Sequence, residues 1–158
     1  MTTTNAMRLL TQAGIPYTPL EYDYDESDLS GTHAAAALSL EQDATFKTLV
    51  MRGEKVGLFV CCIPVAEEVD ARKAAKAIGE KKADMLHVKE LLGATGYIRG
   101  GCSPVGMKKR LPTLIDETAQ LFERIAISAG TRGQMLLLSP DALASYVGAT
   151  YTDLVKMD

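Results

Sequence analysis

The sequence has no apolar run approaching the roughly 18 residues that a membrane-spanning helix needs. Its first residues also lack the basic start and apolar core of a secretion signal, so we expect a protein of the cytoplasm. Apolar residues make up 47% of the 158 residues and charged residues 23%, which is ordinary for a globular protein. No internal repeat or Pro/Ser-rich linker divides the chain, so residues 1–158 are expected to form a single domain.

The sequence is also poor in residues that build metal and nucleophile sites. It has three cysteines, Cys61, Cys62 and Cys102, with no C-x-x-C pair, and only two histidines. This odd, unpaired set of thiols suits a reducing compartment and does not have the spacing of a zinc site. Neither a G-x-x-x-x-G-K-[ST] phosphate loop nor a G-x-G-x-x-G fingerprint is present. We therefore expect no metal and no cofactor.

The net charge of −3 argues against a protein that coats or packages nucleic acid, and no DNA partner is expected. It leaves room for an RNA held by one local basic patch. The adjacent cations Lys108, Lys109 and Arg110 could hold a phosphate backbone. The alternative interpretation is a solvated charged face, which most charge runs form.

Predicted strands and helices alternate along the chain, and one clear hairpin is centred on Gly53-Glu54-Lys55. This mixture favours an α/β or α+β domain with a mixed sheet over a pure Rossmann unit. Strands are predicted at 17–24, 45–52, 56–63, 113–115, 124–128 and 134–138, with shorter ones at 97–99 and 151–155. Helices are predicted before Gly14, over 30–37, 70–78 and 88–92, and from Ser139 to Gly148.

Lys47 is the first candidate functional residue. Along an extended 45–52 segment its side chain shares a face with Leu49 and Met51. A lysine on such an apolar face either reaches out to the edge of the sheet or projects into a partly desolvated cavity. In a cavity, burial lowers the lysine pKa, and the cation could steer a phosphate or polarise an ester carbonyl. Spacing alone leaves both interpretations open.

The glycine-rich loop 100–106 is the second candidate. Its glycines allow close backbone approach to a ligand and present N–H groups to an anion or a carbonyl oxygen, while Ser103 adds a hydroxyl. The alternative is an ordinary tight connection. Cys102 lies in this loop, but neither histidine is recognisably paired with it, so a Cys–His nucleophile has no support.

Five short motifs occur in an order and spacing that resemble the YbaK family of Cys-tRNA(Pro) deacylases, relatives of the editing domain inserted in bacterial prolyl-tRNA synthetases. The resemblance extends from the first predicted helix to the last few residues. Each motif alone is weak, but the five together are specific. They are Thr45-Phe46-Lys47-Thr48-Leu49, Lys73-Ala74-Ala75-Lys76-Ala77-Ile78-Gly79, Thr95-Gly96-Tyr97, the loop 100–106 with Lys108-Lys109 after it, and Gly148-Ala149-x-Tyr151-Thr152-Asp153.

The resemblance implies a mixed, barrel-like sheet with flanking helices and a pocket for the aminoacyl end of a tRNA. It assigns the catalytic role to Lys47, while Thr48 favours the cysteine-specific branch, because relatives specialised for alanine have Lys-Asn there. Cys102 stands where the family usually has an aliphatic residue, and we interpret it as a packing residue. The implied substrate-binding residues are Tyr22, Thr48, Gly100, Gly101, Ser103 and Gly106, and the implied tRNA-binding residues are Lys108, Lys109 and Arg110.

The implied reaction is removal of cysteine from mischarged Cys-tRNA(Pro), and also from Cys-tRNA(Cys), by attack of the substrate's own thiol on its ester. The expected partners are the aminoacylated tRNA and prolyl-tRNA synthetase in a ternary complex. Two alternatives stay open: a deacylase for another mischarged tRNA such as Ala-tRNA(Pro), and a non-catalytic module that binds tRNA ends.

Overall fold

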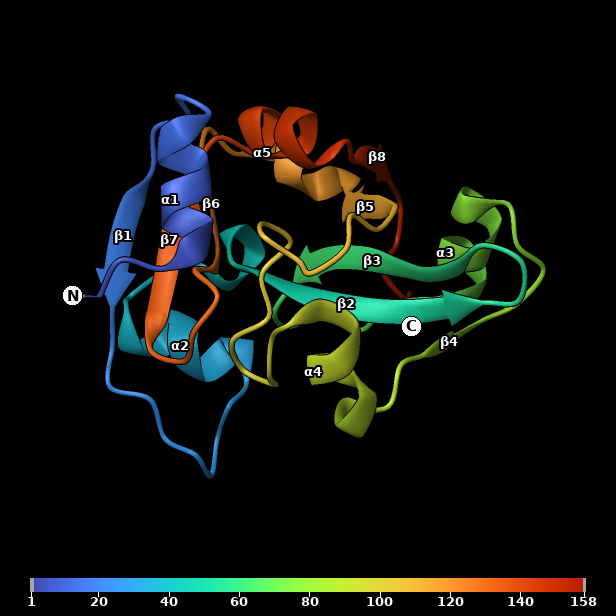
Figure 1. The fold of residues 1–158 in the computed structure, drawn as a ribbon, viewed down its shortest axis with the longest axis horizontal. Coiled ribbons are helices and arrows are strands. Elements are labelled where there is room, and N and C mark those ends of the chain that lie inside the picture. Colours follow the sequence, from blue (N-terminus) through green and yellow to red (C-terminus); the bar gives the residue numbers. More distant parts are fainter. Residues whose placement is uncertain (1, 158) are drawn as a thin grey trace.

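Two β-sheets form the frame of the protein in a computed structural model that describes residues 2–157 (Figure 1). The smaller sheet is antiparallel, and the larger one is mixed, because β4, β2 and β3 pair antiparallel while β3, β5 and β8 pair parallel. The smaller sheet has the order β1 (Thr18–Glu21), β7 (Gln134–Leu138), β6 (Ile125–Ser128). The larger has the order β4 (Ala83–Met85), β2 (Phe46–Gly53), β3 (Gly57–Pro64), β5 (Thr113–Asp116), β8 (Thr150–Thr152).

The predicted combination of a mixed sheet and flanking helices is confirmed. A single parallel bridge between Thr45 and Ala126 joins the two sheets. Within residues 2–157 the strands form two separate sheets and do not close into a barrel.

The helices begin and end where the sequence supplies caps. The side chains of Ser30, Asp70 and Ser139 accept hydrogen bonds from backbone N–H groups in the first turns of their helices. Gly79 and Gly148 end two helices in the left-handed conformation that glycine adopts without steric cost. The helices are α1 (Asn5–Gln12), α2 (Gly31–Ala37), α3 (Ala71–Ile78), α4 (Val88–Thr95) and α5 (Pro140–Val147), with short 3₁₀ turns η1 (Gln42–Ala44) and η2 (Glu117–Leu121).

Each sheet face is covered by its own layer. The main core lies between the sheets, where Phe46, Ile115 and Leu136 pack with residues of α1 and α5. Helix α3 packs on the outer face of the larger sheet, and α2 on the outer face of the smaller one. Helix α4 packs against Val50 and Cys102 in a fourth cluster. Helices α2 and α4 thus lie near the same end of β2, which is where the candidate site forms (Figure 1).

Two local predictions differ from the structure. Residues 97–99 are not a strand, because Tyr97 turns the chain: its N–H donates to the Thr95 hydroxyl and its own hydroxyl donates to the Val105 carbonyl. The short strand β4 was not predicted from the sequence and pairs with the end of β2. No helix among residues 2–157 combines the length and apolar character needed to cross a membrane.

Candidate functional site

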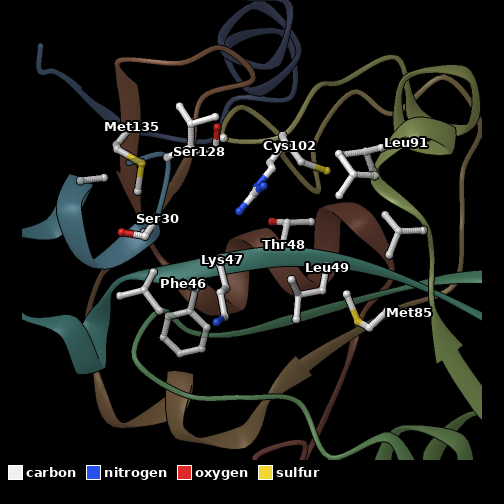
Figure 2. Close-up of a pocket in the computed structure, with 18 of the residues that line it drawn as sticks. Ser30, Phe46, Lys47, Thr48, Leu49, Met85, Leu91, Cys102, Ser128 and Met135 are labelled. Atoms are coloured by element: carbon white, nitrogen blue, oxygen red, sulfur yellow. The ribbon is translucent and has the colours of Figure 1, made fainter. Parts of the chain in front are cut away.

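A cavity of about 380 Å³ lies beside residues 46–50 of β2, between α2 and α4 (Figure 2). Strand β4 pairs only with Met51, Arg52 and Gly53, so in the described chain no strand covers the edge of β2 along residues 46–50. The open edge explains how side chains from both faces of one strand reach the same cavity. The volume is in the range of small-molecule sites.

The wall of this cavity is assembled from segments far apart in the sequence, and most of it is apolar. The residues from β1, α2 and the segments around them are Tyr22, Leu29, Ser30, Gly31 and Ala34. Those from β2 and the chain after β3 are Phe46, Lys47, Thr48, Leu49, Val50 and Val65. Those around α4, in the glycine-rich loop and on β6 and β7 are Met85, Leu86, Val88, Leu91, Arg99, Gly100, Cys102, Ser128 and Met135.

Lys47 lies half-buried at the open edge of β2. Its register partner is Ile63, which belongs with Met51 to the core under α3, so the predicted shared face is confirmed. Burial lowers the pKa of Lys47, while the negative charges of Glu68 and Glu67 partly oppose that shift. The side chain therefore combines the two interpretations that spacing left open: it lies at a strand edge and also lines a partly desolvated cavity.

Thr48 leaves β2 on the side opposite to Lys47 and points toward Cys102 (Figure 2). Its hydroxyl lies 3.9 Å from the Cys62 thiol. Tyr22 lines the same cavity, and burial raises the pKa of its phenol. The cavity thus has a cation on one side of the β2 edge and a hydroxyl facing the glycine-rich loop on the other.

The structure divides the four predicted loop residues. Gly100 lines the cavity, whereas Gly101 and Ser103 are buried behind its wall and Gly106 lines a different cavity. Gly101 has a packing role, because a Cβ there would stand 3.1 Å from backbone atoms of Thr131 and Arg132. The absence of a side chain at Gly101 lets the loop lie directly against the turn between β6 and β7.

The loop also contains backbone donors that no other residue uses. The Gly101 N–H donates to the Ile98 carbonyl at 3.0 Å. Within residues 2–157, in contrast, no acceptor lies within hydrogen-bond range of the N–H groups of Gly100 and Cys102. Both residues line the cavity, and the Tyr97 hydroxyl bound to the Val105 carbonyl holds the loop in place. Unengaged N–H groups of this kind can stabilise an oxyanion.

No nucleophile–base pair lines the cavity. Burial raises the pKa of the Cys102 thiol to about 12, so the thiol is protonated at neutral pH. Ser128 uses its hydroxyl oxygen to accept from the Gly130 N–H at 3.2 Å. The described lining residues include no histidine, aspartate or glutamate that could serve as a general base. Within residues 2–157 no group of three or more histidine, cysteine, aspartate or glutamate side chains could hold a metal ion.

The basic triplet is split by the structure. Lys108 lies against Gly96 at the end of α4, and its N–H donates to the Thr95 carbonyl. Lys109 and Arg110 instead line a second cavity on the other side of the glycine-rich loop. None of the three lines the first cavity.

Sequence reasoning did not find Arg99, Ser128 and the apolar wall from α2 and α4. The cation of Arg99 directly before Gly100 is a signal that was available, because it precedes a loop already singled out. The contribution of Ser128 and Met135 has no such signal, since it depends on how the β6–β7 hairpin packs beside β2.

Comparison with known proteins places the chain in a family. The model of the aminoacyl-tRNA editing domain matches residues 30–146. A protein of Enterococcus faecalis named "Putative Cys-tRNA(Pro)/Cys-tRNA(Cys) deacylase EbsC" is 46% identical over 155 residues, which cover 98% of this chain and 94% of that protein.

Solved structures agree with this assignment. The structure titled "Crystal structure of a putative trans-editing enzyme for prolyl tRNA synthetase" has a TM-score of 0.82 and 25% identity, covering 99% of this chain and 100% of the other. The "hypothetical protein APE2540" has a TM-score of 0.85 at 20% identity, with 94% and 97% covered, and supports the fold alone. The motif resemblance is therefore confirmed: this chain belongs to the aminoacyl-tRNA editing domain family.

Proposed function

We propose that the protein is a trans-editing deacylase that removes cysteine from mischarged Cys-tRNA(Pro), and also from Cys-tRNA(Cys), with the aminoacyl ester bound in the first cavity. The observation that supports this most directly is the character of that cavity. It presents Lys47 and two unengaged backbone N–H groups but no nucleophile–base pair. Such a site suits a substrate that brings its own nucleophile. The name of the E. faecalis relative, 46% identical, points to the same substrates.

The reaction needs little from the enzyme beyond folding the substrate and stabilising charge. The cysteine sulfur attacks the carbonyl carbon of its own ester, a C–S bond forms, and the C–O bond to the ribose breaks. The thiol proton ends on the ribose oxygen, so the products are the free tRNA and a thiolactone. Holding the thiol near the carbonyl can lower the barrier by about 7–11 kcal/mol at best.

Each proposed residue then has a defined task. The N–H groups of Gly100 and Cys102 donate to the oxyanion that forms on the carbonyl oxygen, and each such donor contributes about 3 kcal/mol. Lys47 supplies a partly desolvated cation that holds the phosphate or the ester of the terminal nucleotide. Thr48 and Tyr22 shape the pocket around the cysteine side chain. Serine and alanine esters lack a comparable nucleophile and are not expected to react.

The partner and the location follow from the substrate. We place the enzyme in the cytoplasm, where tRNA is charged, and in a ternary complex with tRNA and prolyl-tRNA synthetase, the enzyme named for the structural neighbour. Co-elution of the protein with the synthetase only when tRNA is present is the expected result.

The experiment that tests the function measures release of labelled cysteine from Cys-tRNA(Pro), with Ala-tRNA(Pro) as the second substrate. Wild-type protein is expected to release cysteine alone. Lys47→Ala should lower the rate at least about 100-fold, as loss of one electrostatic stabiliser does. Cys102→Ala should keep most of the activity, because the thiol is protonated and is not the nucleophile.

The other outcomes are equally informative. A full rate in the lysine variant would remove the proposed role of Lys47. Loss of activity in a folded Cys102→Ala protein would restore an enzyme nucleophile. Release of alanine instead of cysteine would assign the other branch of the family, and saturable tRNA binding without release of either amino acid would support the non-catalytic module.

A further inference from the structure

A second cavity, of about 270 Å³, lies on the other side of the glycine-rich loop. Pro104 and Gly106 form its wall on the loop side, and Leu9 of α1 and Tyr146 of α5 contribute to it from the helices. In Figure 1 the yellow loop that precedes β5 runs between α1 and α5 on one side and α2 and α4 on the other. The loop therefore separates two cavities.

The chemistry of the second cavity is that of a nucleotide site. Its apolar side is made by aliphatic side chains and the half-buried ring of Tyr146. Its cations are Lys109 and Arg110, and within residues 2–157 neither forms an ion pair. An aromatic ring can stack on a nucleobase, and a nearby free cation can bind the phosphate attached to that base.

Arg110 is held in this position by the fold. Its Nη2 atom lies 2.7 Å from where a Cβ on Gly148 would stand, so the guanidinium lies over the end of α5. Any larger residue at position 148 would displace it. Lys109 is exposed at the rim of the cavity and lies next to Arg110 in the sequence.

The two cavities are close enough to bind neighbouring nucleotides. Cys102 lines the first cavity and Pro104 the second, and two residues of extended chain span at most about 7 Å. A single strand that places its last nucleotide in the first cavity would cross the loop with the next phosphate. The preceding base would then reach the second cavity.

We propose that the second cavity binds the nucleotide that precedes the aminoacylated one in the unpaired 3′ end of the tRNA, with Tyr146 stacking on its base and Lys109 and Arg110 binding its phosphate. This inference rests on the proposed function, because it takes the aminoacyl end to occupy the first cavity. Binding of the preceding nucleotide adds affinity for the tRNA without adding a group to the reacting centre.

Two minimal substrates test it: cysteine esterified to adenosine, and cysteine esterified to the adenosine of the dinucleotide CpA. The readout is the ratio of their kcat/KM values. In wild-type protein the CpA ester should react at least about ten-fold better, as one stacked base and one phosphate contact predict. Lys109→Gln and Tyr146→Leu should each reduce this ratio several-fold, while Tyr146→Phe, which keeps the ring, should preserve it.

Lys81→Gln is the matched control, because Lys81 is an exposed cation that lines neither cavity, and it should not change the ratio. Denaturant unfolding checks that Tyr146→Leu is folded, and the exposed Lys109 supplies a variant that does not depend on packing. An equal rate for the two wild-type esters, or a ratio unaltered by both variants, would overturn the second site. Failure to cleave either ester would instead contradict the proposed function.

Discussion

Lys47 is the residue on which the proposed chemistry depends most, and its protonation is set by two opposing influences. Burial disfavours the ammonium form, and the charges of Glu68 and Glu67 favour it. The net effect lowers the pKa below the ordinary lysine value of 10.5. An activity that needs the ammonium form should therefore be lost earlier on raising the pH than an ordinary lysine would predict.

Replacing both carboxylates, as Glu67→Gln with Glu68→Gln, should lower the pKa of Lys47 further. The physical reason is that the ammonium form loses the two negative charges that stabilise it, while its burial is unchanged. The measurement is an NMR titration of the lysine side chain, assigned with Lys47→Ala. Glu54→Gln, in the exposed turn between β2 and β3, is the control and should leave the midpoint unchanged. A midpoint that rises in the double variant would show that the two glutamates do not act on Lys47 as described.

The placement of Lys47 could be predicted from sequence, whereas the identity of the residues around it could not. Alternation along an extended segment correctly put Lys47 on the face of Leu49 and Met51. The cavity exists because β4 covers only the end of β2, and β4 was not predicted. The walls from Ser128 and Met135 depend on contacts more than 80 residues away from Lys47 in the chain, which local patterns do not encode.

Among the structural elements, the helices were predicted best because their ends are marked chemically. Ser139 as a cap, Pro140 at the first position and Gly148 at the end bound α5 as expected, and Asp70 and Gly79 do the same for α3. The prediction at 97–99 was wrong because Tyr97 looked like a strand residue while its hydrogen bonds make it part of a turn. Aromatic content indicates a strand only where a neighbouring strand is available to pair.

The glycine-rich loop is an element whose position should be sensitive to one methyl group. In Gly101→Ala the new Cβ would stand 3.1 Å from the backbone of Thr131 and Arg132, which is not free to move away. We expect a loss of about 1–3 kcal/mol in the free energy of unfolding. We also expect a lower kcat/KM on Cys-tRNA(Pro), because Gly100 and Cys102 flank the altered position. Denaturant unfolding and the release assay measure the two effects.

Gly93→Ala is the matched control for this prediction. Gly93 lies within α4, and a Cβ there would meet no atom within 4 Å. The substitution should stabilise the protein by about 0.5–1 kcal/mol, since alanine restricts the unfolded chain more than glycine does. An equal effect of the two substitutions would show that the close approach at Gly101 has no energetic weight.

At the scale of the whole molecule, the mixed sheet was predicted but the strand order was not. The parallel pairs β3–β5 and β5–β8 bring together segments separated by whole helices and loops, and their choice depends on how the helical layers pack. The single bridge between Thr45 and Ala126 that joins the sheets is likewise a product of packing. These long-range choices place the ends of α2, α4 and the glycine-rich loop around one edge of β2.

The distribution of charge over the molecule determines which part of a tRNA it can bind. The cations that line the first two cavities are Lys47, Arg99, Lys109 and Arg110. A third cavity, of about 670 Å³ between η2 and the chain after β8, is lined by carboxylates that include Asp43, Glu67 and Glu117, and its surface should repel phosphate. With a net charge of −3, the protein has no general attraction for a polyanion.

Binding of tRNA should therefore depend only moderately on salt. Four cations on a single strand predict a slope of log K against log salt concentration no steeper than about −3, because each phosphate contact contributes about −0.7. Fluorescence anisotropy of uncharged tRNA(Pro) between about 50 and 200 mM salt measures this slope. Lys109→Gln should make the slope shallower, whereas Lys76→Gln, an exposed cation on α3 that lines none of these cavities, should not. A slope much steeper than about −4 would mean that the paired stem of the tRNA is bound by other basic residues, and recognition would then not be confined to the unpaired 3′ end.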